Sequence, residues 1–259
     1  MQEGEKLRVP PVYEQSSGDK IVPGSKSVEL IKKNILYKDT NVIILNKPSG
    51  MVVHGGTGQA FGVIESVRKL FRDEDNCIQL VHRLDKETSG ILMLARNMQY
   101  LKFLHKQFKD RQVYKLYKAL LCGHIPDRVM RIELPLARNT VSSGERMVAV
   151  DAGGKQAQTI IKLEKYVGND SLVEVELTTG RTHQIRVHAS EQGYPVAGDG
   201  KYGDKKYNKY LNKYGLKRLF LHAYKMRVPG NDNYRPVEVT APIPEDLSAV
   251  LQSLQTGAK

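Results

Sequence analysis

The chain has 259 residues, of which 40 are Lys or Arg and 28 are Asp or Glu, so its formal net charge is +12. A hydrophobic fraction of 40% excludes a disordered chain, and the length excludes a small module that needs disulfides or metals to fold. The excess of positive charge predicts a polyanionic partner, and nucleic acid is the commonest polyanion inside a cell.

The sequence shows no sign of a membrane or secreted protein. No stretch approaches the roughly 20 apolar residues of a membrane span. The first ten residues carry charged side chains and lack the apolar run of a secretion signal. Two cysteines, Cys77 and Cys122, are too few for a disulfide framework or a four-cysteine zinc site. We therefore expect a cytoplasmic protein.

Residues 1–30 are rich in Pro, Gly and Ser and show no helical period, so they are expected to form an irregular segment or linker. Residues 31–259 are expected to form the folded domain. Its predicted strands are 41–46, 90–95, 113–121, 156–167, 172–177, 218–228 and 237–241. Its predicted helices are 61–71, 97–108 with Asn97 as N-cap, and one that opens near residue 243. Runs of strands with few helices between them predict the α+β class, with a mixed, mostly antiparallel sheet flanked by helices.

The most informative segment is residues 82–90, His-Arg-Leu-Asp-Lys-Glu-Thr-Ser-Gly. Its Thr, Ser and Gly predict a loop between two apolar strands, and a charged loop on a rigid scaffold is a common place for catalytic groups. Taken without further information, Arg83 and Asp85 fit an ordinary surface ion pair equally well.

A second charged segment covers residues 177–188, where Arg181, His183, Arg186 and His188 crowd a turn and the start of a predicted helix. Thr182 is the candidate N-cap of that helix. The two histidines are five residues apart and face different sides of a helix, which disfavours a metal site. Structural hydrogen bonding is the alternative interpretation of both.

Residues 201–218 contain seven Lys or Arg, four Tyr and one acidic residue. Such a segment is typical of RNA contact, because cations neutralise phosphates and aromatic rings stack on bases. The candidate cations are Lys201, Lys205, Lys206 and Lys209. The alternative is a helix that packs its tyrosines inward, since Tyr207, Tyr210 and Tyr214 have near-helical spacing.

Together these segments resemble the RluA family of pseudouridine synthases, in particular its RluC- and RluD-like branch. Residues 82–90 match the signature around the family's catalytic aspartate, and residues 177–188 match a later motif. Further matches are Asn46-Lys-Pro-x-Gly50, Lys115-x-Tyr-x-Ala119, Pro195-x-x-Gly-Asp-x-x-Tyr-Gly203 and Leu221-His-Ala223. Larger members of the branch carry an N-terminal S4-type RNA-binding domain. Residues 6–11 resemble the end of such a domain, so we expect a catalytic domain without the S4 domain, which this protein either lacks or has lost by trimming.

The resemblance implies the pseudouridine synthase fold with an active-site cleft, and isomerisation of specific uridines in large-subunit ribosomal RNA. The reaction detaches uracil from ribose and rejoins it through carbon, so neither a cofactor nor a metal is implied. By resemblance, Asp85 is the catalytic carboxylate, which either attacks the sugar carbon or accepts a ribose proton. Arg186 is its ion-pair partner, which favours the ionised carboxylate. Tyr117 stacks on the target base.

The substrate base has to leave the RNA stack before it can react. By resemblance, Arg83 fills the gap that the base leaves, and Ile185 and Val187 contact the uracil. Two other functions stay open: a transfer RNA pseudouridine synthase, and a non-catalytic ribosomal RNA-binding assembly factor on the same fold. A base-releasing glycosidase would produce free uracil instead. We expect the protein to be a monomer that binds RNA.

Overall fold

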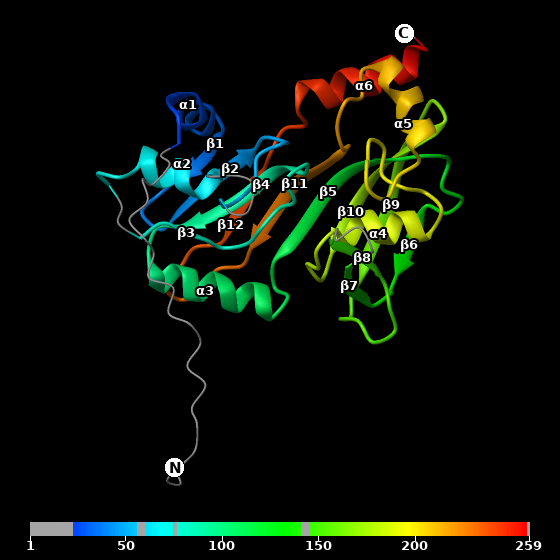
Figure 1. Ribbon diagram of the computed structural model, residues 1–259. Coiled ribbons are helices and arrows are strands. Elements are labelled where there is room, and N and C mark those ends of the chain that lie inside the picture. Colours follow the sequence, from blue (N-terminus) through cyan, green and yellow to red (C-terminus); the bar gives the residue numbers. More distant parts are fainter. Residues whose placement is uncertain (1–22, 56–60, 75–76, 141–145, 258–259) are drawn as a thin grey trace, which may run out of the picture.

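A ten-stranded mixed sheet runs through the molecule (Figure 1). The computed structural model describes residues 23–55, 61–74, 77–140 and 146–257. The strands of the large sheet are β1 (Ile35–Lys38), β2 (Val42–Lys47), β3 (Gln79–Leu80), β4 (Ser89–Ala95), β5 (Tyr114–Leu121), β6 (Val129–Ile132), β9 (Thr159–Val167), β10 (Asp170–Leu177), β11 (Leu221–Val228) and β12 (Val237–Thr240). A separate antiparallel hairpin consists of β7 (Leu136–Thr140) and β8 (Arg146–Val150). The helices are α1 (Ser25–Lys33), α2 (Val63–Leu70), α3 (Met98–Lys109), α4 (Gln184–Glu191), α5 (Lys205–Leu211) and α6 (Glu245–Thr256), and a single 3₁₀ turn covers Asn212–Tyr214.

The strand order is β1-β2-β4-β11-β5-β10-β9-β6, with β3 beside β4 and β12 beside β11. Among the described strands, β4 and β11 form the one parallel pair, and their neighbours pair antiparallel. The expected α+β class with a mixed, mostly antiparallel sheet is therefore confirmed. None of the described helices has the length and apolar character needed to cross a membrane.

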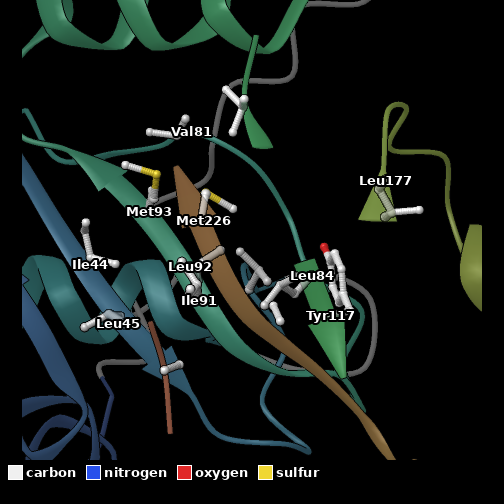
Figure 2. Packing of buried hydrophobic residues seen from close by; sticks show 14 of the residues in the cluster. Ile44, Leu45, Val81, Leu84, Ile91, Leu92, Met93, Tyr117, Leu177 and Met226 are labelled. Atoms are coloured by element: carbon white, nitrogen blue, oxygen red, sulfur yellow. The ribbon is translucent and has the colours of Figure 1, made fainter. Parts of the chain in front are cut away.

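Strands β2 and β4 form the centre of the main apolar cluster (Figure 2). Residues 42–45 and 91–95 have no exposed surface at all, because they are covered on both faces of the sheet. Burial on both faces explains why each strand is an unbroken apolar run rather than an alternating one. Leu84 and Tyr117 belong to the same cluster, at the end where the loop with residues 82–88 enters β4. This packing gives that loop a rigid base.

A second apolar cluster holds α5 and α6 against the sheet. It joins Leu120 of β5 and Leu172 of β10 to Leu247 and Val250 of α6. Three partly buried tyrosines pack onto the same cluster, namely Tyr207, Tyr210 and Tyr214. The alternative interpretation is therefore confirmed, because the near-helical spacing of these rings serves packing. Stacking of their remaining exposed surface on RNA bases stays a prediction.

Three local features differ from the sequence-based expectations. Helix α1 begins at Ser25, inside the segment expected to be irregular, because Ile31 is fully buried and α1 packs against α2. Residues 1–22 of that segment lie outside the described residues. Thr182 does not cap α4: its hydroxyl accepts a hydrogen bond from Arg138, and His183 precedes the helix instead. Strands β1, β3, β6, β7 and β8 were not expected. The predicted cap of α3 is confirmed, since the Asn97 side chain accepts from the Tyr100 N–H at 2.8 Å.

Gly90 is required by the parallel pairing of β4 with β11. Its φ is +110°, and a Cβ atom there would overlap the backbone of Ala223. Gly90→Ala is therefore expected to lower the free energy of unfolding by about 3 kcal/mol or more, from positive-φ strain plus overpacking. Gly193→Ala is the matched control: its φ is +81° with open space around it, so it should cost about 1 to 2 kcal/mol. Chemical denaturation measures both, and equal losses would show that the β4–β11 approach is not what requires glycine.

Candidate active site

Asp85 lies on the loop between β3 and β4, and a buried lysine fixes that loop from behind. The Lys47 Nζ donates hydrogen bonds to the carbonyl oxygens of Pro48, Met51 and Lys86 at 2.8, 3.0 and 3.0 Å. Burial lowers the pKa of Lys47 to about 7. The Gly50 N–H also donates to the Lys86 carbonyl, at 2.9 Å. The Asn-Lys-Pro-x-Gly segment thus holds the residue next to Asp85 in place.

The far end of the loop is anchored to β11 by His222. Its Nε2 lies 3.2 Å from the Ala241 carbonyl oxygen, which can only accept, so Nε2 carries the proton. Its Nδ1 consequently accepts from the Ser89 hydroxyl at 2.9 Å. Burial lowers the pKa of His222 to about 4. His82 is structural in the same way: its Nε2 accepts from the Met93 N–H at 3.1 Å, and burial lowers its pKa to about 4. Neither histidine is available for proton transfer near neutral pH.

Tyr117 of β5 reaches the same place from the centre of the sheet. It pairs with Ala223 on one side and Val175 on the other, and only 9% of its surface is exposed. Because side chains alternate along a strand, its neighbour Lys118 faces away and pairs with Glu174 at 2.9 Å. Burial raises the pKa of Tyr117, and the nearby Asp85 adds to the effect. The Tyr117 hydroxyl therefore stays protonated at neutral pH.

A small pocket of about 80 Å³ lies between these elements. Residues from the Asp85 loop, from β5 and from α4 line it, among them Arg83, Asp85, Tyr117, His183, Ile185 and Arg186. The Asp85 side chain is 27% exposed, so a ligand in the pocket can reach its carboxylate.

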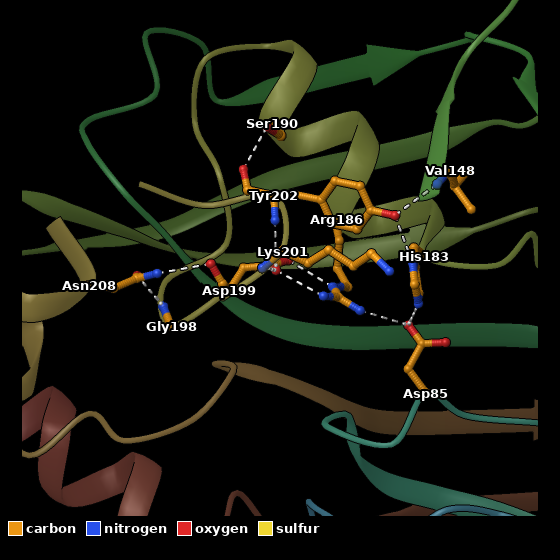
Figure 3. A network of polar contacts seen from close by, with 10 residues as sticks. All are labelled: Asp85, Val148, His183, Arg186, Ser190, Gly198, Asp199, Lys201, Tyr202 and Asn208. Carbon is orange, nitrogen blue, oxygen red and sulfur yellow. Dashed lines mark hydrogen bonds and ion pairs between the residues drawn. The ribbon is translucent and has the colours of Figure 1, made fainter. Parts of the chain in front are cut away.

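Arg186 of α4 bridges two carboxylates of unequal burial (Figure 3). Its Nη1 lies 3.6 Å from Asp85 Oδ2, while its Nε and Nη2 bind Asp199 at 2.7 and 2.8 Å. The Asp199 side chain has no exposed surface. The predicted pairing of Arg186 with Asp85 is present, but the principal partner of Arg186 is Asp199.

This buried pair keeps both of its members charged. Burial opposes the charge on Arg186, but the hydrogen bonds and the charge of Asp199 outweigh burial and raise the pKa of Arg186. Burial likewise opposes ionisation of Asp199, but Arg186 and the N–H groups of Lys201 and Tyr202 outweigh it and lower the pKa of Asp199. Asp85 thus faces a permanent positive charge whose orientation a second carboxylate fixes.

Comparisons with known proteins identify the family of the chain. Residues 41–191 match the family described as RNA pseudouridylate synthase. The chain belongs to this family. Ribosomal large subunit pseudouridine synthase C of Haemophilus influenzae is 43% identical over 98% of this chain and 79% of its own length. The protein of the same name from Escherichia coli is 39% identical over 98% of this chain and 81% of its own length.

Two solved structures of pseudouridylate synthases share the fold. Human RNA Pseudouridylate Synthase Domain Containing 4 has a TM-score of 0.74 at 25% identity, covering 88% of this chain and 95% of that one. Human RNA Pseudouridylate Synthase Domain Containing 1 has a TM-score of 0.71 at 30% identity, covering 88% and 89%. The family and fold that the sequence motifs implied are therefore confirmed.

The other residues expected to contact RNA in this pseudouridylate synthase lie in different places. Arg83 is exposed at the edge of the pocket, and Ile185 lines it. Val187 does not line it: this side chain is buried in a third apolar cluster with Leu136 and Val148, because two residues further along α4 the helix faces another way. The expected contact between Val187 and uracil is therefore wrong.

The predicted basic segment divides into two parts. Lys201 lies beside Arg186 and Tyr202 in the polar network of Figure 3. Lys205, Lys206 and Lys209 are exposed on α5, which packs beside the 3₁₀ turn and, through the second apolar cluster, near α6. Their contact with RNA stays a prediction.

Sequence reasoning did not assign a role to Asp199 or Tyr202. Both lie in the segment Pro195-x-x-Gly-Asp-x-x-Tyr-Gly203, which carried the resemblance to pseudouridine synthases but had no chemical reading of its own. A carboxylate within a Gly-rich turn, a short distance after an arginine-bearing helix, is a signal that could have pointed to a partner for Arg186, although it does not by itself establish the contact.

Proposed function

We propose that this pseudouridine synthase isomerises specific uridines in large-subunit ribosomal RNA. The observation that carries the proposal is the ionised Arg186 held 3.6 Å from the reachable carboxylate of Asp85, in a pocket that Tyr117 also lines. The substrate is taken from the relatives, which are named for the ribosomal large subunit. Such a substrate places the activity in the cytoplasm.

The proposed reaction is an internal rearrangement. The bond between the ribose C1′ and the uracil N1 breaks, a bond between C1′ and C5 forms, N1 gains a proton and C5 loses one. Nothing is oxidised or reduced, so the chemistry needs no cofactor. Asp85 either bonds to the sugar carbon or accepts a ribose proton, and both routes use its carboxylate, which faces the positive charge of Arg186. The protonated hydroxyl of Tyr117 is in place to exchange a proton beside the base or the sugar.

A second cavity beside the active site suits the RNA backbone. It has a volume of about 500 Å³, and its lining includes Arg138, Lys155 and Arg181 but, among the residues that the structure describes, no acidic one. It shares Gly180 and Arg181 with the Asp85 pocket. The nucleotides on either side of a flipped-out uridine carry phosphates that have to lie next to the active site. The cavity is therefore a better candidate for phosphate binding than the exposed face of α5.

The two arginines of this cavity are already oriented. Arg138 Nη2 donates to the Thr182 hydroxyl at 2.7 Å, and Arg181 Nε donates to the Gln156 carbonyl at 3.1 Å. A guanidinium group has five N–H donors, so each arginine keeps donors for a phosphate.

Neutralising this cavity is expected to weaken RNA binding in a salt-dependent way. Each lost phosphate contact lowers the slope of log affinity against log salt by about 0.7, so Arg138→Gln with Lys155→Gln should reduce the slope by about 1.4. Binding of a large-subunit RNA fragment, measured by filter retention across a salt series, gives the slope. Lys32→Gln with Lys33→Gln on α1 is a charge-matched control with no expected effect. The triple variant Lys205→Gln, Lys206→Gln, Lys209→Gln tests the alternative surface on α5: if it alone lowers the slope, RNA follows α5 and not the cavity.

The substrate is tested by mapping pseudouridines in cells with and without the gene. We expect loss of specific pseudouridines from large-subunit ribosomal RNA and unchanged transfer RNA. Loss from transfer RNA alone would make the protein a transfer RNA synthase, and unchanged RNA together with a ribosome assembly defect would favour the non-catalytic assembly factor. The protein is expected to act as a monomer, which light scattering during size-exclusion chromatography measures.

A further inference from the structure

We propose that His183, held in one tautomer by Tyr202, is a positioning residue that orients the carboxylate of Asp85 for the isomerisation. This inference rests on the proposed function. It gives a role to two side chains that have none so far: His183, which lines the pocket, and Tyr202 behind it.

The hydrogen-bond directions around Tyr202 determine the tautomer of His183 (Figure 3). The Val148 N–H donates to the Tyr202 hydroxyl oxygen at 3.0 Å. The same oxygen lies 2.7 Å from His183 Nδ1. Burial raises the pKa of Tyr202, so the hydroxyl keeps its proton at neutral pH. Since the Val148 N–H already occupies the oxygen as a donor, we infer that the hydroxyl proton points to Nδ1. Because Nδ1 accepts, the proton of neutral His183 is on Nε2.

This Nε2–H group faces Asp85. His183 Nε2 and Arg186 Nη1 approach the same carboxylate oxygen, Asp85 Oδ2, at 3.8 and 3.6 Å. The other oxygen, Oδ1, is turned away from both groups in Figure 3. Both distances exceed a hydrogen bond, and such contacts tighten when substrate fills an active site. Closure of both groups onto Oδ2 would fix the rotation of the carboxylate and leave Oδ1 to meet the ribose.

Tyr202 links the two partners of Asp85. Its ring lies 5.1 Å from the Arg186 guanidinium carbon and packs edge-on against His183, with ring centroids 5.5 Å apart. His183 itself has a left-handed backbone with φ of +53°. That conformation is uncommon for residues other than glycine, and such residues cluster at functional sites, where the surrounding structure imposes it.

The charges around His183 have opposing effects on its pKa. Burial lowers the pKa of His183, and the cations Arg186 of α4 and Lys201 of the following loop lower it further. Asp85 and Asp199 act against them. Protonation at Nδ1 would also break the hydrogen bond from Tyr202. His183 is therefore neutral near pH 7, so its Nε2–H faces Asp85 as a dipole rather than as a full charge, and it becomes a hydrogen-bond donor once the 3.8 Å gap closes.

Two substitutions of His183 separate positioning from a purely structural role. Asn tolerates a left-handed backbone better than Gln does, so a structural role ranks His183→Asn above His183→Gln. Only the longer Gln brings an amide N–H to the position of Nε2, so a positioning role ranks Gln above Asn. We expect His183→Asn to lower the single-turnover rate about 10- to 100-fold, as a small misplacement of a catalytic group does. We expect His183→Gln to recover most of that loss.

The assay uses a large-subunit ribosomal RNA transcript at saturating concentration, with tritium at C5 of uridine, and thermal melting monitors folding. His188→Gln is the matched control, because His188 contacts Thr159 and the Leu134 carbonyl and does not face Asp85. His188→Gln should lower the melting temperature and leave the single-turnover rate nearly unchanged. A wild-type protein that releases no tritium would contradict the proposed function. An active wild type with His183→Asn as fast as, or faster than, His183→Gln would overturn the positioning role.

Nitrogen NMR of the histidine rings tests the tautomer without substrate. We expect the Nε2–H form of His183 in the wild type, and a mixture of forms in Tyr202→Phe. Freed of the Tyr202 hydrogen bond, Nδ1 should also bind a proton more readily, so the pKa of His183 should rise in Tyr202→Phe. An Nδ1–H form in the wild type, or an unchanged titration in Tyr202→Phe, would overturn the proposal.

Discussion

Asp85→Asn is expected to lower the single-turnover rate by about 10⁴-fold or more, the size of effect seen when a principal catalytic group is removed. The substitution keeps the shape of the side chain but removes the charge that either route requires. Lys47 and Ser89 hold the loop, and Asp85 does not contribute to that anchoring. Folding and RNA affinity should therefore be retained. Quantification of pseudouridine in a large-subunit RNA transcript measures the rate.

Glu87→Gln is the matched control for Asp85→Asn, because Glu87 is an acid on the same loop that does not line the pocket. It should keep nearly full activity. An active Asp85→Asn protein, or an inactive Glu87→Gln protein with normal RNA binding, would show that Asp85 is not the essential carboxylate.

Asp199→Ala is expected to lower the free energy of unfolding by about 3 to 5 kcal/mol, because it leaves the charge of Arg186 buried without its partner. It should also lower the rate, since Arg186 loses the two hydrogen bonds that orient it toward Asp85. Asp246 provides a matched control: it makes a similar two-point pair with Arg218 at 2.6 and 3.0 Å, but its side chain is 57% exposed. Asp246→Ala should cost only about 0 to 1 kcal/mol. Equal losses in urea denaturation would show that burial of the Arg186 pair has no special weight.

The same pair makes stability depend on pH. The pKa of Asp199 is lower in the folded protein than in the unfolded chain, so its contribution is present above the unfolded value of about 4 and is lost as the pH falls below it. The difference in unfolding free energy between the wild type and Asp199→Asn should be largest above about pH 5 and should shrink toward pH 3. Urea denaturation at several pH values measures the difference.

The local apolar pattern was sufficient for elements in which that pattern is unambiguous, whether it is an unbroken run or a helical period. The fully buried β2 and β4, and helix α3 with its Asn97 cap, were predicted because local pattern and tertiary burial agree there. Helix α1 was not predicted because Ile31 is its one buried residue, which is too little to give a recognisable helical period. Thr182 was a reasonable cap by composition, but the left-handed His183 delays the start of α4.

The candidate site shows a similar division. Asp85, Tyr117 and Arg186 were singled out by resemblance, and the fold brings all three to one pocket from three different elements. Asp199 and Tyr202 were not, because their significance depends on contacts with α4 that no local pattern encodes. Val187 was misjudged because it is close in sequence to active-site residues. Its side chain, however, lies on another face of α4 and packs into another apolar cluster.

The most direct test of the central claim uses purified protein and large-subunit ribosomal RNA with tritium at C5 of uridine, without any added cofactor. Formation of the C1′–C5 bond expels the C5 proton, so wild-type protein should release tritium into water in proportion to the pseudouridine formed, and Asp85→Asn should release none. Release of free uracil, or equal tritium release from both proteins, would contradict an isomerisation that depends on Asp85.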